Sequence, residues 1–144
     1  MRLLVTGSGK WTKVDVIEMA LLAETVNVPA RGVLLVHGAC AEGADLIADR
    51  FAKRRGWDVE RHPADWAHHG NRAGQIRNER MVQLGADVCL AFIRNQSPGA
   101  STTEFKARRK GIRTVVWRHD GDRVWLDEQK VDTTRINPDQ GSLF

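Results

Sequence analysis

Three short loops rich in small residues are the parts of this sequence best suited to chemistry. Each loop follows an apolar run and precedes a helical pattern. Small residues at such turns let backbone amides approach an anion closely, and the following helix N-terminus favours negative charge. We therefore predict phosphate or ribose contacts from these loops, at Thr6, Gly7, Ser8, Gly38, Ala39, Gly43, Asp45, Gly99, Ala100, Ser101 and Thr102.

Each loop also has a purely structural interpretation. Thr6–Ser8 is compatible with a tight turn that binds nothing. Asp45 would either hold a ribose hydroxyl or stabilise the first turn of its own helix as a carboxylate. Ser101 and Glu104 have the spacing of a capping box, which closes a helix without any ligand. The sequence leaves both interpretations open.

The surrounding pattern alternates strands and helices. Apolar runs predict strands at about 3–6, 33–37, 87–93 and 114–117, with a weaker edge strand at 58–61. Helical spacing predicts helices after a Thr12–Asp15 capping pair and at about 43–55, 72–84 and 102–110. This order predicts an α/β fold, a Rossmann-like three-layer sandwich with a mostly parallel sheet.

Length and composition fit one globular α/β domain of 1–118 followed by a smaller unit of 119–144. Asp120–Asp122 is a hairpin-turn signal, so this second unit is predicted to be a short hairpin and an extended tail. No apolar run is long enough to span a membrane, and no signal peptide is evident, which predicts a cytoplasmic protein. The two cysteines and five histidines show no ligand spacing, so neither a metal nor an obligatory cofactor is expected.

The net charge of +4 is mild, and the basic residues are spread along the chain. It permits binding to phosphates without indicating nucleic acid. The basic clusters 53–55 and 108–110 close predicted helices, where cations complement the helix dipole. Both clusters are therefore interpreted as solvated helix ends.

A family resemblance rests on an ordered set of short motifs within about residues 1–117. They are Thr6–Ser8, His37–Cys40 with Gly43–Asp45, Ala64–Trp66, and Ile76–Asn78 with Met81. Together they resemble the YspA-type branch of the SLOG superfamily. The resemblance implies a Rossmann-like nucleotide-binding domain, related to the cytokinin-activating phosphoribohydrolases, to a DNA-processing protein that acts on single strands, and to molybdenum-cofactor carriers.

The phosphoribohydrolase relatives have an R-K-x-x-M helix motif followed by P-G-G-x-G-T-x-E-E. Arg77 and Met81 match the first motif, with Asn78 in place of its lysine, but no glutamate matches the second in register. Cleavage of an N-glycosidic bond passes through a cationic state that a carboxylate stabilises. The resemblance thus implies Arg77 and Asn78 as ligand-binding residues, leaves Arg77 and Glu104 as candidate catalytic residues, and favours binding over turnover.

Trp66 is a further candidate ligand-binding residue in a predicted loop over the sheet edge. Its indole would stack on a base if exposed. The structural alternative is a lid packed against the helix at 72–84.

The last five residues of the sequence resemble the bacterial sliding-clamp-binding motif Q-L-S/D-L-F. Gln140, Ser142, Leu143 and Phe144 match it, and Gly141 replaces leucine. Two bulky apolar residues in a polar segment would fill a hydrophobic pocket on a partner while glutamine binds its rim. The alternative is that Leu143 and Phe144 cover the chain's own apolar surface near Trp117 or Trp125.

Three functional hypotheses follow. The first is a nucleotide-binding module whose residues 140–144 bind the DNA polymerase sliding clamp and modulate replication. The second is a nucleoside monophosphate phosphoribohydrolase. The third, from fold analogy and basic charge, is a single-stranded nucleic-acid-binding protein. A homodimer is compatible with each of them.

Overall fold

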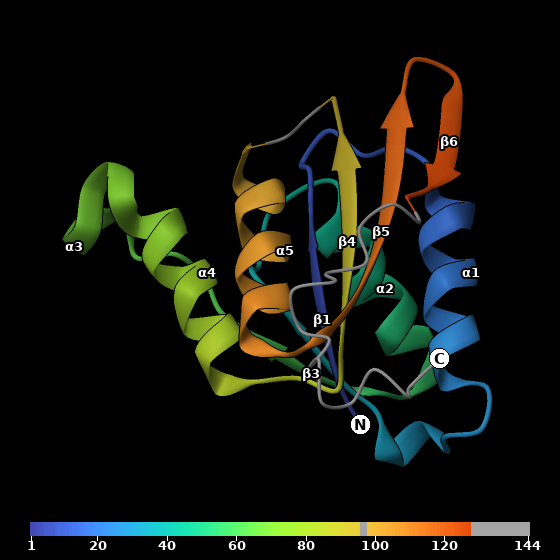
Figure 1. Ribbon diagram of the computed structural model, residues 1–144. Helices are drawn as coiled ribbons and strands as arrows, with labels where there is room; N and C mark the ends of the chain where they lie inside the picture. Colours follow the sequence, from blue (N-terminus) through green and yellow to red (C-terminus); the bar gives the residue numbers. More distant parts are fainter. Residues whose placement is uncertain (96–97, 128–144) are drawn as a thin grey trace, which may run out of the picture.

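The protein forms a single six-stranded sheet in the order β3-β2-β1-β4-β5-β6 (Figure 1). The structure is a computed structural model and describes residues 1–95 and 98–127. Its strands are β1 (Arg2–Gly7), β2 (Leu34–His37), β3 (Asp58–Arg61), β4 (Val88–Arg94), β5 (Arg113–Asp120) and β6 (Arg123–Leu126). Its α-helices are α1 (Val14–Thr25), α2 (Ala44–Arg55), α3 (Trp66–His69), α4 (Ala73–Leu84) and α5 (Pro98–Lys110), with 3-10 turns η1 (Ala30–Gly32) and η2 (Gly70–Arg72).

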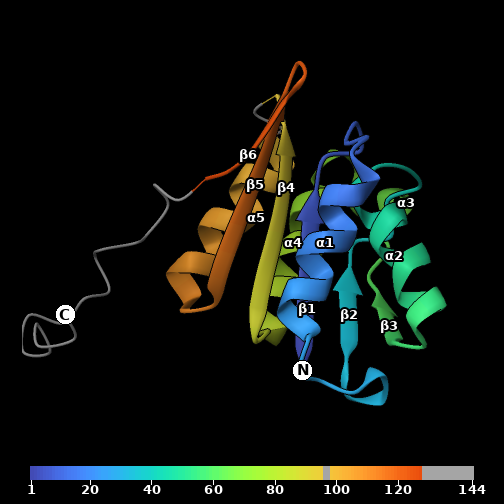
Figure 2. The same cartoon turned by 90° about the vertical axis from the view of Figure 1, so that its right-hand side faces the viewer.

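Helices cover both faces of the sheet. Helices α1 and α2 lie on one face and α4 and α5 on the other, as the two perpendicular views show (Figures 1 and 2). Strands β1 to β5 are parallel along the sheet, and only β6 runs antiparallel, to β5. The predicted three-layer α/β sandwich with a mostly parallel sheet is therefore confirmed, including β3 at the sheet edge and the β5–β6 hairpin.

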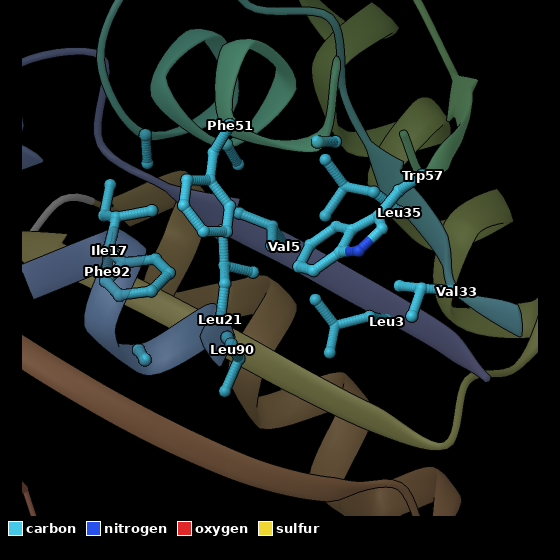
Figure 3. Close-up of a cluster of buried hydrophobic side chains, with 14 of the residues drawn as sticks. Leu3, Val5, Ile17, Leu21, Val33, Leu35, Phe51, Trp57, Leu90 and Phe92 are labelled. Carbon is cyan, nitrogen blue, oxygen red and sulfur yellow. The ribbon is translucent and has the colours of Figure 1, made fainter. Parts of the chain in front are cut away.

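Two apolar layers hold the helices to the sheet. Alternate side chains of β1 point to opposite faces. Leu3 and Val5 join the larger cluster under α1 and α2 (Figure 3), whereas Leu4 joins the cluster under α4 and α5. Because both faces of the central strands are buried, the continuous apolar runs that predicted them are explained.

Several predicted details of the helices are wrong. The Thr12–Asp15 capping pair does not form, because α1 begins at Val14 after Lys13 and has no side-chain cap. Helix α5 begins at Pro98 rather than near Thr102. Proline suits the first turn of a helix because its missing N–H needs no partner there. The segment around Trp66, predicted as a loop, forms the short helix α3.

The division into 1–118 and 119–144 remains a prediction. Its boundary lies inside β5, which continues to Asp120 before the turn at Gly121. Residues 128–144, which include the clamp-like segment Gln140–Phe144, lie outside the described residues.

Two loops at the carboxyl end of the sheet cross in direct contact at Gly43. A Cβ added to Gly43, whose φ is +76°, would lie 2.3 Å from the Ser8 carbonyl oxygen. The Ala44 amide also donates to that oxygen. Gly43 is therefore required by loop crossing as well as by backbone conformation.

We expect Gly43→Ala to destabilise the protein by at least about 3 kcal/mol, since it combines left-handed strain with overlap of backbone atoms. Gly56→Ala is the matched control, because Gly56 has a similar φ of +73° but open space around its Cβ position. It should cost only about 1 kcal/mol. Urea denaturation of both variants measures the difference, and equal losses would contradict the crowding argument.

Candidate functional site

A small cavity lies where the strand order reverses, at the carboxyl ends of β1 and β4. Ligands of open parallel sheets bind at this switch point. The cavity measures about 110 Å³ and opens between β1, the loop after β2, and helices α4 and α5. Its lining comprises Val5, Thr6, Gly7, Gly38, Cys40, Asp45, Arg77, Asn78, Met81, Gly99 and Ala100. We call it the switch-point cavity.

Asp45 is the buried carboxylate of the switch-point cavity. Its side chain sits in the first turn of α2 and only 6% of the residue is exposed. Its Oδ2 accepts a hydrogen bond from the Cys40 amide at 3.2 Å, whereas its Oδ1 has no hydrogen-bond partner in the described part of the chain. Burial raises the pKa of Asp45, although His37, the Cys40 amide, Arg77 and the Gly38 amide oppose the rise. A ligand hydroxyl that donates a hydrogen bond to Oδ1 would offset the free-energy cost of burying this carboxylate.

Arg77 is the cation of the same cavity and projects from the middle of α4. Its Nη1 donates to the carbonyl of Gly38, and to that of His62 at 3.3 Å. Its Nε donates to Asn78 Oδ1 at 2.6 Å. These partners are neutral, so the guanidinium charge is not cancelled by hydrogen bonding. The Nη2 atom has no hydrogen-bond partner within residues 1–95 and 98–127, and it is thus free to bind an anionic ligand.

The absence of a side chain at Gly38 makes space for the Arg77 guanidinium. A Cβ added to Gly38 would lie 2.6 Å from Arg77 Nη1. The neighbouring Ala39 has a left-handed φ of +58°, and its amide donates to His37 Nδ1 at 2.9 Å. His37 Nε2 in turn lies 2.6 Å from Asp49 Oδ2, so the ring donates its Nε2 proton to that carboxylate. A buried histidine therefore shapes the loop that frames the cavity.

Comparisons with known proteins identify the family of this chain. A sequence profile of the YspA, cpYpsA-related SLOG family matches residues 1–69. The Gene 61 protein of Mycobacterium phage D29 is 43% identical over 119 residues, which cover 79% of this chain and 94% of that protein. The chain belongs to the YspA, cpYpsA-related SLOG family. No solved structure matches it.

Membership of the SLOG family suggests a nucleotide-related binding module. The switch-point cavity brings together eight of the residues that we expected to bind a ligand: Thr6, Gly7, Gly38, Asp45, Arg77, Asn78, Gly99 and Ala100. They come from four separate segments of the SLOG chain. Their convergence depends on the parallel sheet, which places the carboxyl ends of β1, β2 and β4 at one edge.

Other expected ligand-binding residues do not line the switch-point cavity. The Ser8 amide donates to the Phe92 carbonyl at 2.9 Å, so that amide is engaged by the fold. Ala39 and Gly43 shape the loop without lining the cavity. Thr102 is exposed on α5. The Ser8 hydroxyl also accepts a hydrogen bond from the Lys10 amide at 3.1 Å.

The proposed capping box between Ser101 and Glu104 does not form, because both residues lie inside α5. Glu104 is buried and accepts a hydrogen bond from Arg108 Nε at 2.7 Å, one turn later. Its charge contributes, after burial, to raising the pKa of the Cys89 thiol to about 12.

Glu104 and Arg77 line different cavities. Glu104 and Ser101 belong to a cavity of about 660 Å³ beside β5 and β6, together with Phe105, Arg118 and Trp125. The structure thus does not unite the two residues considered for N-glycosidic hydrolysis at one cavity. This separation weakens the phosphoribohydrolase hypothesis.

Trp66 is both exposed, as a base-stacking residue would be, and in contact with α4, as a lid would be. The residue is 60% exposed, yet its Cη2 atom lies 3.5 Å from the position of a Cβ added to Gly74 on α4. The indole therefore rests along α4 while leaving much of its surface open to solvent.

A third cavity shares the Arg77 side chain with the switch-point cavity and is larger than it. It measures about 520 Å³ and is lined by Arg61, His62, Pro63, Ala64, Asp65, His69, Ala73, Ile76, Arg77 and Arg80. We call it the basic cavity. Sequence reasoning missed Arg61, Arg80 and Cys40 as cavity residues. One signal was available, because Arg80 follows Arg77 at the i, i+3 spacing that places side chains together on a helix.

The described residues offer neither a metal-binding cluster nor a membrane-spanning helix. No group of three or more histidine, cysteine or acidic side chains there is arranged to hold a metal ion. None of the helices in these ranges has the length and apolar character needed to cross a membrane.

Proposed function

We propose that this SLOG chain binds a nucleotide or nucleotide-derived ligand at the switch-point cavity. The observation that carries the proposal is the pairing of a buried carboxylate that lacks a partner for Oδ1 with the charge of Arg77 in the same cavity. Carboxylates recognise ribose hydroxyls, and arginine recognises phosphate. Gly99 lines the cavity with open space around its Cβ position, which leaves room for close approach of a ligand there.

Titration calorimetry with a panel of ribonucleotides tests this function directly. We expect binding of mono- and diphosphates, and weaker binding of their 2′,3′-dideoxy analogues, because those lack the hydroxyls that Asp45 would accept. Absence of binding by every nucleotide in the panel would overturn the proposal.

We further propose that residues 140–144 bind a bacterial DNA sliding clamp, so that the ligand-binding module is recruited to replicating DNA. The support is the match of Gln140, Ser142, Leu143 and Phe144 to the clamp-binding pattern. Gly141 in place of leucine removes an apolar contact and adds ordering entropy, which predicts modest affinity.

Deletion of residues 140–144 is expected to abolish binding to a purified clamp. A mycobacterial clamp is the suitable probe, since a relative comes from a mycobacteriophage. The double variant Leu143→Ala and Phe144→Ala should reduce affinity at least tenfold, because the apolar pair fills the pocket. Gly141→Leu should strengthen binding. Surface plasmon resonance measures all of these, and equal binding by the intact and shortened chains would refute the tail interaction.

A further inference from the structure

The basic cavity has an excess of positive charge, which would favour a second anionic group of the ligand beside Arg77. Arg61, Arg77 and Arg80 line it, together with His62 and His69. Asp65 is the carboxylate of this lining, and its Oδ1 already accepts a hydrogen bond from the His68 amide. The guanidinium groups thus outnumber the carboxylates in the lining.

The three arginines are not equally available. Arg61 donates to Asp49 at 2.7 and 3.1 Å, so its charge is largely compensated. Arg77 has only neutral hydrogen-bond partners, as described above. Arg80 has no ion-pair partner among residues 1–95 and 98–127, and it lies one turn after Arg77 on α4. Arg77 and Arg80 are therefore the two cations able to bind an incoming anion.

The volumes of the two cavities also favour a ligand that extends into the basic cavity. At about 110 Å³, the switch-point cavity is below the usual range of roughly 300–1,000 Å³ for ligand pockets, whereas the basic cavity at about 520 Å³ is within it. Arg77 lines both cavities. A ligand that binds Asp45 in the switch-point cavity and also reaches the basic cavity would pass Arg77, the residue that the two linings share.

We propose that the ligand is a nucleotide with two consecutive phosphoryl groups, the first bound by Arg77 and the second by Arg80 in the basic cavity. This inference rests on the proposed nucleotide-binding function and adds the class of ligand. The source of the diphosphate is either a free nucleoside diphosphate or a nucleotide whose second phosphate is esterified to a further group. Both sources present the same charged pair to the two arginines.

The test compares AMP, ADP and ADP-glucose by titration calorimetry at low ionic strength, with the same series for the nucleotides of the other bases. We expect the full chain to bind ADP or ADP-glucose about tenfold more tightly than AMP. A preference for ADP indicates a free terminal phosphate, and a preference for ADP-glucose indicates an esterified one.

Arg80→Gln is expected to reduce the diphosphate-to-monophosphate affinity ratio from about ten to near one. Arg72→Gln is the matched control, because Arg72 is an exposed arginine of the neighbouring turn that does not line the basic cavity. It should leave the ratio within about twofold of the parent.

Equal affinity for mono- and diphosphates in the parent would overturn the inference while leaving the proposed function intact. Equal loss of the ratio in both variants would also overturn it, since it would show only a general effect of net charge. Failure of every nucleotide to bind would instead defeat the proposed function, and this inference with it.

Discussion

Asp45→Asn is expected to weaken ribonucleotide binding by about 10- to 100-fold, because it replaces a charged acceptor with a neutral amide. The preference for ribonucleotides over 2′,3′-dideoxynucleotides should disappear in the same variant. Calorimetric titration measures both effects. Glu42→Gln is the matched control, since Glu42 is an exposed carboxylate of the same loop, paired with the exposed Lys10.

The same substitution should not weaken the fold. Burial raises the pKa of Asp45, so keeping it ionised at neutral pH costs folding free energy. An amide of similar size removes that cost, and we expect Asp45→Asn to be as stable as the parent or more stable by up to about 1 kcal/mol. Thermal unfolding measures this. A large loss of stability, or unchanged nucleotide affinity, would show that Asp45 is a structural carboxylate.

Ligand binding should also depend on pH through Asp45. Because its pKa is raised, protonation begins at a higher pH than for an ordinary aspartate, and the protonated group is a poorer acceptor for ribose hydroxyls. Affinity in the parent should thus fall as the solution becomes mildly acidic. Asp45→Asn should lack this part of the pH dependence.

Asp49→Asn is expected to destabilise the protein by about 2–3 kcal/mol at neutral pH, because the buried Asp49 carboxylate interacts with three cationic or hydrogen-bonding partners. It contacts His37, Arg61 and the i+4 residue Lys53. Burial alone would raise the pKa of Asp49, but hydrogen bonds from Arg61 and His37 hold it well below its usual range. Asp58→Asn is the control, as Asp58 is exposed at the start of β3.

The stabilisation from Asp49 has a defined pH window. A carboxyl whose folded pKa is depressed stabilises the protein above its unfolded pKa of about 3.9 and loses this contribution as pH falls toward the folded value. Denaturation curves of the parent and Asp49→Asn should thus differ most above about pH 5 and converge below pH 4. A constant difference down to pH 2 would contradict this account. Glu60, whose pKa the Arg2 and His62 hydrogen bonds lower to about 2, adds to the acid sensitivity of the parent and the variant alike.

Local sequence patterns were sufficient to predict the fold class. Continuous apolar runs such as 33–37 and 87–93 arise because central parallel strands are buried on both faces, and this requirement is visible without coordinates. Gly56 likewise marked the end of α2, since it adopts the left-handed conformation that glycine favours. The loops at the carboxyl ends of the strands were recognisable for the same kind of local reason.

Only the tertiary structure decided which residues of those loops line a cavity. Ser8 looked like an anion-binding residue, but its amide is held by Phe92, 84 positions away in the sequence. Glu104 had capping spacing, yet α5 starts about one turn earlier, and Glu104 lines a different cavity from Arg77. Asp45 and Arg77 are distant in sequence, and the sheet brings them to one cavity. Hydrogen-bond partners and cavity walls come from segments that are remote in the chain. A local sequence pattern can therefore suggest candidate residues, but it cannot predict which of them lie together in the folded protein.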